Sequence, residues 1–539
     1  MRFARSQNWL AMFLLCLSTA AGQKPEARQT EMDRATEEFK KQTAGLGLRA
    51  GEQNGKRNGG GPKPVWHGRV FENLRNDFLD AIPHEIRQRG SDKSLLRRNQ
   101  FGFNLGGPAF IPKLLSGRNT YFSVSYEGMR ERISRTYLRT IPTVAERNGD
   151  WSATVDQAGR PLAIYDPAST RLNPSYRPAE PVSESNPQYE RSLFPGGVMP
   201  ANRLDPEAKR RMQSYPDPNA AAGPFFANNF FVNSPETNTA NGWLAKVDHS
   251  LGEKHRVTLD IAISNGTLGA ARWFSSEANP GPSDRRFQSR RGSLEHVFTA
   301  SPSTVNTATF HVSSSTSSTA SPVFPVYQFA PYLQMGTSYP VSRNASNTYV
   351  WTDALSSRRG KHSLRGVVQY ATYQVNTYWP QYPSGSYRFS PGLTSLPGVV
   401  NTGHAFASYM LGLAEYAEAS LVLSPSYFRR NAVHASFRDQ YEAAKGLTIS
   451  LGISVDRYSP RTEKYDRQST IDLEAINPAN GRKGALVAAA RNGKGRAFQP
   501  MLTRLSPSLS IVWNPRGTSK TVVRASFSRS YSPIPLYSS

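Results

Sequence analysis

The sequence predicts an all-β protein, a transmembrane antiparallel β-barrel (partial or truncated) with long extracellular loops. Apolar and polar residues alternate with period two in stretches of about ten residues, the length of a membrane-crossing strand. No apolar run after the N-terminus is long enough for a membrane-spanning helix. Short turns alternate with long connections rich in Pro, Gly, Ser and Asn, as in outer-membrane barrels.

The clearest strand covers residues 446–458. Its apolar side chains fall on one face and its polar ones on the other, because successive side chains of a strand point to opposite sides. The expected lipid-facing set is Leu447, Ile449, Leu451, Ile453 and Val455. We expect Leu447 at the periplasmic rim and Tyr458 at the outer interface, where aromatic girdles lie.

A second strand, residues 256–264, alternates in the same way and meets residues 243–247 across a short turn. Similar short joins are expected at residues 301–303, 357–361, 443–446 and 514–519. We expect polar residues of these strands to line a lumen, namely Thr448, Ser450, Asp456, Thr258 and Asp260. The competing interpretation is the solvated face of a soluble sheet.

The long connections show no period. They are residues 141–243, 266–288, 316–344, 379–399 and 461–498. Roughly a dozen candidate strands remain, including residues 120–126 and 521–531, fewer than a closed barrel of transporter size needs. The sequence therefore predicts a partial barrel or a truncated chain.

The first residues have a different character. Residues 1–22 read as a secretory signal peptide, with basic Arg2 and Arg5, an apolar middle and a small-residue cleavage region. The only cysteine, Cys16, lies inside it, so the mature chain would use no disulfides. Residues 23–64 are polar and then rich in Gly and Pro, which predicts a flexible periplasmic linker.

The chain carries a formal net charge of +25. Its arginine pairs, such as Arg97-Arg98 and Arg429-Arg430, are scattered along the sequence. Scatter fits a long surface against anionic lipid headgroups better than one groove for DNA. A solvated excess of arginine on loops explains the charge equally well. Export makes nucleic acid an unexpected partner.

No pattern of catalytic or cofactor-binding residues stands out. The nine histidines are isolated, and Gly102 to Gly107 lacks the strand–glycine–helix context of a phosphate loop, so we expect tight backbone packing there. Glu127 with Arg130 and Arg132 reads as an end-of-strand charge cluster. We therefore expect no enzyme, no cofactor, no metal site and no catalytic residue, and the ligand-binding residues stay unknown.

Several motifs resemble TonB-dependent outer-membrane receptors of the Oar-like type. The resemblance covers residues 65–531 and rests on the order of the motifs more than on any one of them. They are residues 67–77 and 99–108, then 119–128, 141–143, 148–152, 164–167, 194–198, 200–203 and 215–219, and further on 243–249, 351–362 and 405–413. Residues 119–128 are similar to the first long barrel strand of that family.

The resemblance implies a domain plan. Residues 65–115 would be the remnant of the plug's end and the beginning of the barrel, and residues 116–539 the Oar-like barrel portion. Family members have a full plug before this point and a barrel that continues further. We find no energy-coupling segment in residues 23–64.

The resemblance also implies a function in the outer membrane: capture or uptake of a ligand, driven through the TonB complex, with outer-membrane lipids around the barrel. Carbohydrate, peptide and siderophore ligands all stay open. The alternative is a secreted soluble β-protein that binds polysaccharide on aromatic residues such as Trp351, Tyr378 and Trp379.

Overall fold

The computed structural model describes residues 65–82, 84, 93, 95–109, 119–155, 159–221, 227–422, 424–515 and 521–531. The predicted signal peptide and linker, residues 1–64, lie outside the described residues. None of the described helices is long and apolar enough to cross a membrane.

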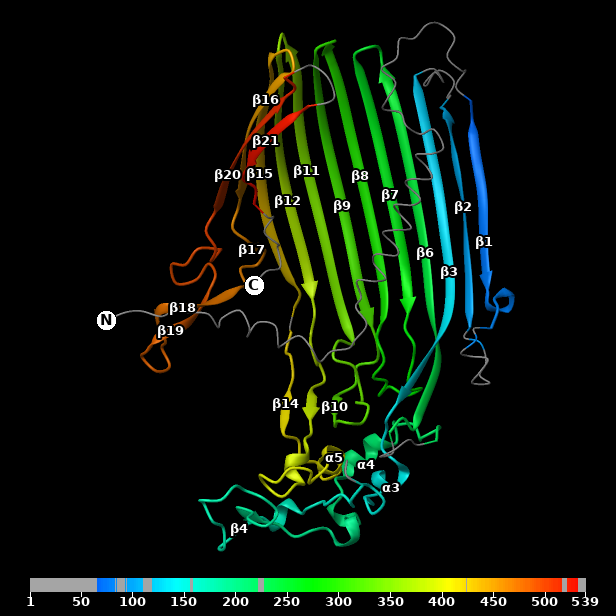
Figure 1. Ribbon diagram of the computed structural model, residues 1–539, viewed down its shortest axis with the longest axis vertical. Coiled ribbons are helices and arrows are strands. Elements are labelled where there is room, and N and C mark those ends of the chain that lie inside the picture. Colours follow the sequence, from blue (N-terminus) through cyan, green and yellow to red (C-terminus); the bar gives the residue numbers. More distant parts are fainter. Residues whose placement is uncertain are drawn as a thin grey trace. The chain divides into compact units, whose positions relative to one another are not determined.

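A single 14-stranded antiparallel sheet dominates this part of the chain (Figure 1). In the order of the sheet, its strands are β1 (His67–Asn76), β2 (Leu96–Pro108), β3 (Thr120–Arg139), β6 (Phe230–Leu251), β7 (His255–Gly269), β8 (Asp284–Ser301), β9 (Thr304–Ala320), β11 (Val341–Arg359), β12 (His362–Tyr378), β15 (Ser426–Ala444), β16 (Leu447–Tyr458), β20 (Leu502–Trp513) and β21 (Val523–Ser528), with β17 (Thr462–Glu463) paired to β15.

The two ends of the sheet differ as the sequence predicts. The pairs β6–β7, β8–β9, β11–β12 and β15–β16 are joined by short hairpin turns at one end, which we call the short-turn end. The long connections and the helices lie at the other end (Figure 1). Gly446 closes the β15–β16 turn with a φ of +80°, which an L side chain rarely adopts.

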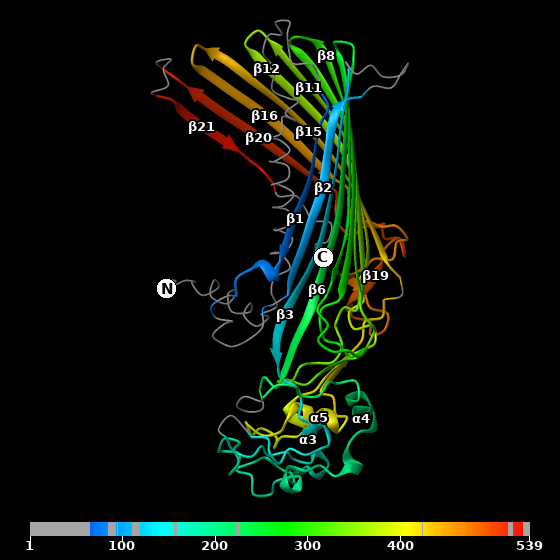
Figure 2. The ribbon, with the colours of Figure 1, turned by 90° about the vertical axis from the view of Figure 1, so that its right-hand side faces the viewer.

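The sheet is open, with β1 and β21 as its edges. Figure 2 shows the first and last strands bending toward the same side of the middle strands, the curvature of a barrel wall. Residues of the predicted plug remnant, 65–115, contribute β1 and β2, which pair along ten residues from His67↔Gly106 to Asn76↔Arg97. β1 and β2 are therefore strands of the main sheet.

Within β2, Gly102 fits the tight packing expected of the Gly102–Gly107 run. An added Cβ there would lie 2.2 Å from the carbonyl oxygen of Tyr126 on β3 and 2.9 Å from the ring of Phe71 on β1. No side chain fits in that space, so glycine allows the close approach of the first three strands.

The register gives the sheet one apolar and one polar face, because residues directly opposite each other in an antiparallel pair point to the same side. On the apolar face, Leu451, Ile453 and Val455 of β16 are exposed and lie opposite Leu509, Pro507 and Leu505 of β20. The same face continues through Phe437, Val368, Leu355, Leu294, Ile261 and Trp243.

The apolar face is confined to the part of each strand nearer the short turns. On β7 it runs from Val257 to Ile263 and ends at Asn265, and on β16 it ends at Arg457. On β9 it gives way to a serine-rich stretch, residues 313–318. The apolar band of a membrane barrel is about 25 Å tall. Strands as long as β6, with 22 residues, therefore extend beyond the membrane.

The expected position of Tyr458 is wrong. Tyr458 lies opposite Ala432 and on the same face as Asp456, whereas Arg457 follows Val455 on the apolar face. Tyr458 is therefore on the polar side of the sheet and not in a lipid-facing girdle. Tyr458 comes two residues after Asp456, so strand alternation already placed both on one face. Its aromatic side chain nevertheless suggested a position at the membrane interface.

Several strands are longer than expected. β3 continues to Arg139 and is the third strand of the sheet, and β6 begins at Phe230 instead of near Trp243. These extensions lie beyond the apolar band, and the start of β6 buries Phe230 and Val232 in a protein core instead of turning an apolar face to lipid. Their pairing is complete nevertheless, from Thr120↔His249 to Arg139↔Phe230.

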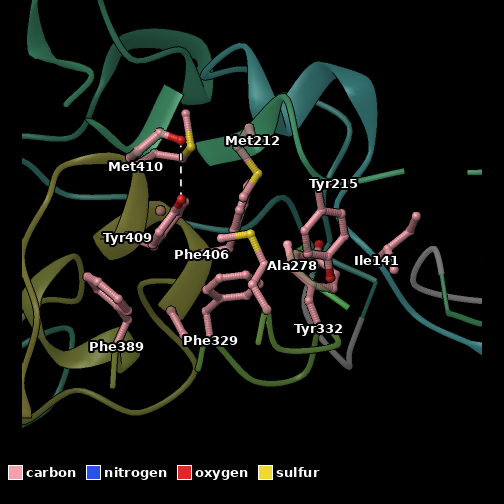
Figure 3. Close-up of a cluster of buried hydrophobic side chains, with 14 of the residues drawn as sticks. Ile141, Met212, Tyr215, Ala278, Phe329, Tyr332, Phe389, Phe406, Tyr409 and Met410 are labelled. Carbon is pink, nitrogen blue, oxygen red and sulfur yellow. Dashed lines mark hydrogen bonds between the residues drawn. The ribbon is translucent and has the colours of Figure 1, made fainter. Parts of the chain in front are cut away.

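The long connections are folded around a shared core. We call the described residues within 141–229, 270–283, 321–340 and 379–425 together the loop domain. Its buried side chains come from all four connections and include Met212, Ala278, Phe329 and Phe406 (Figure 3). Phe230 and Val232 at the start of β6 belong to the same cluster, so the core joins the loop domain to the strand ends.

The loop domain carries most of the small elements. Its helices are α3 (Val144–Arg147), α4 (Pro206–Met212) and α5 (Ala405–Met410), with short 3₁₀ turns η2 (Pro167–Ser169), η3 (Pro195–Gly197), η4 (Ala201–Arg203) and η6 (Pro391–Leu393), and its strands are β4 (Arg171–Leu172), β5 (Tyr189–Glu190), β10 (Val326–Gln328), β13 (Ser386–Arg388) and β14 (Tyr416–Glu418). Outside it are η1 (Asp77–Leu79) and a hairpin of β18 (Ser469–Ile476) and β19 (Lys483–Ala488).

Candidate functional site

The polar face of β12, β15 and β16 carries a hollow of about 230 Å³. Ala371 and Ala432, which lie opposite each other, leave the space. Tyr373 and Tyr458 bound it on one side, and Gln369, His434 and Asp456 on the other. Aromatic rings and hydrogen-bonding groups therefore surround one small space on the side of the sheet away from the lipid-facing residues.

Two of the lining residues contact each other. His434 Nδ1 and Asp456 Oδ1 are 2.8 Å apart, and the two residues lie directly opposite in the β15–β16 register. The buried Arg430 lies nearby, with its guanidinium 5.6 Å from the Tyr458 ring centre and its Nε donating to the Ser459 carbonyl at 3.1 Å. The hollow can accept a polar group that both stacks and hydrogen-bonds.

The expected lumen residues lie on the polar face. Thr448, Ser450 and Asp456 share one side of β16, and Thr258 and Asp260 share the corresponding side of β7. The sheet spreads them over distant strands, and only Asp456 lines the hollow. His434, the partner of Asp456, was missed because only the register of the β15–β16 hairpin places the two residues, 22 positions apart, directly opposite each other.

The polar face of the first strands is rich in ion pairs. Arg98 pairs with Glu131 across β2 and β3. Arg135 Nε lies 2.9 Å from Glu236 Oε2, and Arg256 Nη2 lies 2.8 Å from Asp248 Oδ1. Each of these three arginines therefore has a carboxylate partner on its own face of the sheet.

The predicted charge cluster of Glu127, Arg130 and Arg132 is wrong in two respects. Glu127 lies in the middle of β3, and it accepts a hydrogen bond from Gln100 on the polar face. Arg130 is three residues further on, so it lies on the opposite face, where its Nη2 donates to Asn241 Oδ1 at 2.8 Å. Because side chains alternate along a strand, Glu127 and Arg130 lie on opposite faces although they are close in sequence.

Among the residues that the structure describes, no group of three or more His, Cys, Asp or Glu side chains is arranged to hold a metal ion. Two histidines do meet: His255 Nδ1 and His296 Nε2 are 3.0 Å apart, and their rings stack with Phe298 beside them. They lie on the apolar side of β7 and β8 near the short-turn end.

The aromatic residues considered for polysaccharide binding do not form one platform. Trp351 lies opposite Tyr370 on the apolar face and packs on Phe310 with ring centres 4.5 Å apart. Tyr378 is further along β12 by about 26 Å at about 3.3 Å per residue. Trp379 packs instead on Tyr339, 5.1 Å away.

A buried carboxylate organises the core of the loop domain. Glu146 is 1% exposed. Its Oε2 accepts from the Thr143 N–H at 2.8 Å and hydroxyl at 3.0 Å, which forms the capping box of α3. Its Oε1 accepts from the Thr154 hydroxyl at 2.9 Å and the Tyr332 hydroxyl at 2.6 Å. Burial and the nearby carboxylate raise the pKa of Tyr332.

His404 is the second titratable group of this core. It is 9% exposed, and its Nδ1 accepts from the Phe406 N–H at 3.2 Å as the N-cap of α5. Its ring centre lies 5.2 Å from that of Tyr332. Burial lowers the pKa of His404 to about 4, against a smaller opposing effect of the Glu146 carboxylate.

The lowered pKa of His404 predicts a pH-dependent loop domain. The unfolded state takes up the proton near pH 6.5 and the folded state only near about 4, so stability is full above pH 6.5 and falls between these values. The difference corresponds to about 3 kcal/mol below about pH 4. Hydrogen exchange at the amides of α5, measured from pH 7.5 to 4, should show it.

The matched variant is His404→Asn, which keeps a side-chain acceptor for the Phe406 N–H and cannot titrate. Hydrogen exchange in this variant should lack the part of the pH dependence that comes from His404, whatever the variant's stability at neutral pH. A pH dependence equal to that of the unchanged protein would contradict the assignment to His404.

The fold and the distribution of side chains are those of a transmembrane β-barrel protein, whose antiparallel sheet has one lipid-facing and one polar face. A family model described as "Outer membrane beta barrel domain" matches residues 65–539. The chain belongs to this family of outer-membrane proteins.

Similar solved structures include "Copper transporter OprC", at 10% identity and a TM-score of 0.37, with 86% of this chain and 46% of that chain covered. The outer membrane transporter YddB from Escherichia coli matches at 8% identity and a TM-score of 0.37, covering 86% and 51%. The siderophore receptor PiuA from Acinetobacter baumannii matches at 9% identity and a TM-score of 0.37, covering 83% and 50%. The chain thus spans about half the length of these structures. No curated protein matches.

Proposed function

We propose that this protein is the barrel and extracellular portion of a TonB-dependent-type receptor, which binds a ligand at its loop domain and passes it along the polar face. The proposal rests on one observation. Every major strand from β3 to β20 turns apolar residues to one face of the sheet and polar residues to the other, and both faces are continuous from strand to strand.

The loop domain supports the receptor part of the proposal. Its folded core gives the long-loop end of the strands a fixed surface, and a rigid scaffold is what positions binding residues on loops. The motifs that resemble Oar-like receptors support coupling to TonB. Transport through a polar lumen needs no covalent chemistry, so we propose no enzymatic activity.

The orientation of the wall can be tested at Leu451, which is 56% exposed in the middle of the apolar side of β16. Leu451→Arg places a charge in the hydrocarbon region and should cost about 2–4 kcal/mol of membrane stability. The measurement is the fraction of protein that assembles into the outer membrane and resists extraction.

The control is Ser450→Arg, one residue earlier on the polar face of the same strand. It should assemble almost as well as the unchanged protein. Equal losses in the two variants would argue against a lipid-facing and a water-facing side. Recovery of the unchanged protein in the soluble fraction without detergent would overturn the membrane assignment and support a secreted polysaccharide-binding protein.

A further inference from the structure

Two arginines face each other on the polar side of the sheet. Arg365 on β12 lies directly opposite Arg438 on β15, and both side chains are exposed. Like charges directly opposite in an antiparallel pair destabilise it. In the first strands, the arginines of this face have carboxylate partners: Arg98, which lies opposite Arg75, pairs with Glu131, and Arg135 and Arg256 meet Glu236 and Asp248.

No described carboxylate neutralises this pair. Within the described residues, neither Arg365 nor Arg438 makes an ion pair or a side-chain hydrogen bond. The nearest carboxylates in register on this face are engaged elsewhere: Glu442 accepts from Arg358 at 3.2 Å, and Asp456 is bonded to His434 at 2.8 Å. Asp439, next to Arg438 in sequence, points to the other face and is bonded to His362 at 2.7 Å.

The neighbouring strands bring a hydroxyl group beside the pair. Gly452 of β16 lies opposite Arg438, and Ser508 of β20 lies opposite Gly452. An added Cβ on Gly452 would lie 2.5 Å from Ser508 Oγ and 3.7 Å from Arg438 Nε. The Ser508 hydroxyl therefore occupies the space above the glycine, next to the Arg438 guanidinium.

We propose that Arg365, Arg438 and Ser508 form a binding site for an oxyanion, the carboxylate or phosphate group of a ligand. Guanidinium groups present a planar set of donors that matches both anions. An anion between the two arginines converts their repulsion into two charge-assisted contacts, and the serine hydroxyl adds a third donor. The register of these three residues and the exposure of the two arginines carry the assignment.

The proposal rests on the proposed function, in which this face lines the passage, and it narrows the ligand to one with an acidic group. Arg365 lies a few residues from the β11–β12 hairpin, so the site is near the short-turn end, beyond the hollow at His434 and Asp456 on the way from the loop domain. A ligand would reach it after passing the hollow.

The test uses the full chain purified in detergent, with inorganic phosphate and citrate as separate probes in isothermal titration at low ionic strength. We expect at least one probe to bind. Arg365→Gln and Arg438→Gln should each weaken that binding by about ten-fold or more, the loss expected for one charge-assisted contact. The preferred probe distinguishes a phosphate from a carboxylate ligand.

The matched control is Arg291→Gln, which makes the same charge change on the same face of β8, where Arg291 lies opposite Ala262 and Ser313. It should bind the probe like the unchanged protein. Equal weakening in all three variants, or no binding of either probe to the unchanged protein, would overturn the proposal.

A second measurement does not depend on tight binding. Without added anion, Arg365→Gln should raise the melting temperature because it removes the repulsion, and the anion should no longer raise it further. A lower melting temperature in anion-free buffer would show a structural role instead. Normal membrane assembly together with no anion effect would reject this site and leave the proposed function standing, whereas failure of the Leu451→Arg test would reject the function itself.

Discussion

Phe406→Ala should destabilise the loop domain by about 3–5 kcal/mol, the cost of deleting a fully buried aromatic side chain. Phe406 is 0% exposed and lies at the centre of an aromatic cluster. Its ring centre is 5.2 Å from that of Phe329, 5.6 Å from those of Tyr332 and Tyr409, and 6.3 Å from that of Trp151. Phe406 and these partners come from three separate connections between strands (Figure 3). The cavity that the substitution leaves would loosen the contacts among them.

The measurement is the opening free energy of the loop domain from hydrogen exchange, together with protease cleavage of the loops on intact outer membranes. Leu421→Ala is the control, because Leu421 is 86% exposed in the last of the four connections. It should leave exchange and cleavage unchanged. Membrane assembly should persist in both variants, since the apolar face of the sheet is untouched. Unchanged protection in Phe406→Ala would show that the connections do not share a cooperative core.

The membrane part of the wall was predictable from sequence because its constraint is local. Lipid on one side and water on the other impose alternation on neighbouring residues, so Leu447 to Val455 and the strand around Ile261 could be recognised directly. The β15–β16 hairpin followed from the turn at Gly446. The same local rule stops at the edge of the membrane, which explains why β6 was predicted to begin near Trp243 and not at Phe230.

The loop domain could not be predicted because its contacts are distant in sequence. Tyr409 donates to the carbonyl of Ala208 at 3.1 Å, and Arg191 donates to the carbonyl of Ser395 at 2.6 Å. Each segment alone buries too little to show a period, so the connections looked like unstructured loops. The same limit hid the opposition of Arg365 and Arg438, which only the register of β12 and β15 reveals.

Glu146→Gln should destabilise the loop domain by about 3–5 kcal/mol. Each oxygen of the carboxylate accepts two hydrogen bonds, and an amide NH₂ in place of either oxygen would face two donors. Hydrogen bonds to a charged group contribute about 1.5–3 kcal/mol each, and donors left unpaired in the core add their own cost. The damage should reach Thr143 at the start of α3 and Tyr332 in the connection between β9 and β11.

The size of this effect separates a buried network from an ordinary surface charge. Glu207 on α4 makes ion pairs with Arg210 and Arg211, both at 2.6 Å, but it lies at the surface. Glu207→Gln removes the same charge and should leave hydrogen exchange of the loop domain nearly unchanged, because exposed ion pairs are weakened by solvent and salt. If the two variants behaved alike, the Glu146 carboxylate would contribute no more than a solvated one, and the loop domain would owe its order to apolar packing around Phe406 alone.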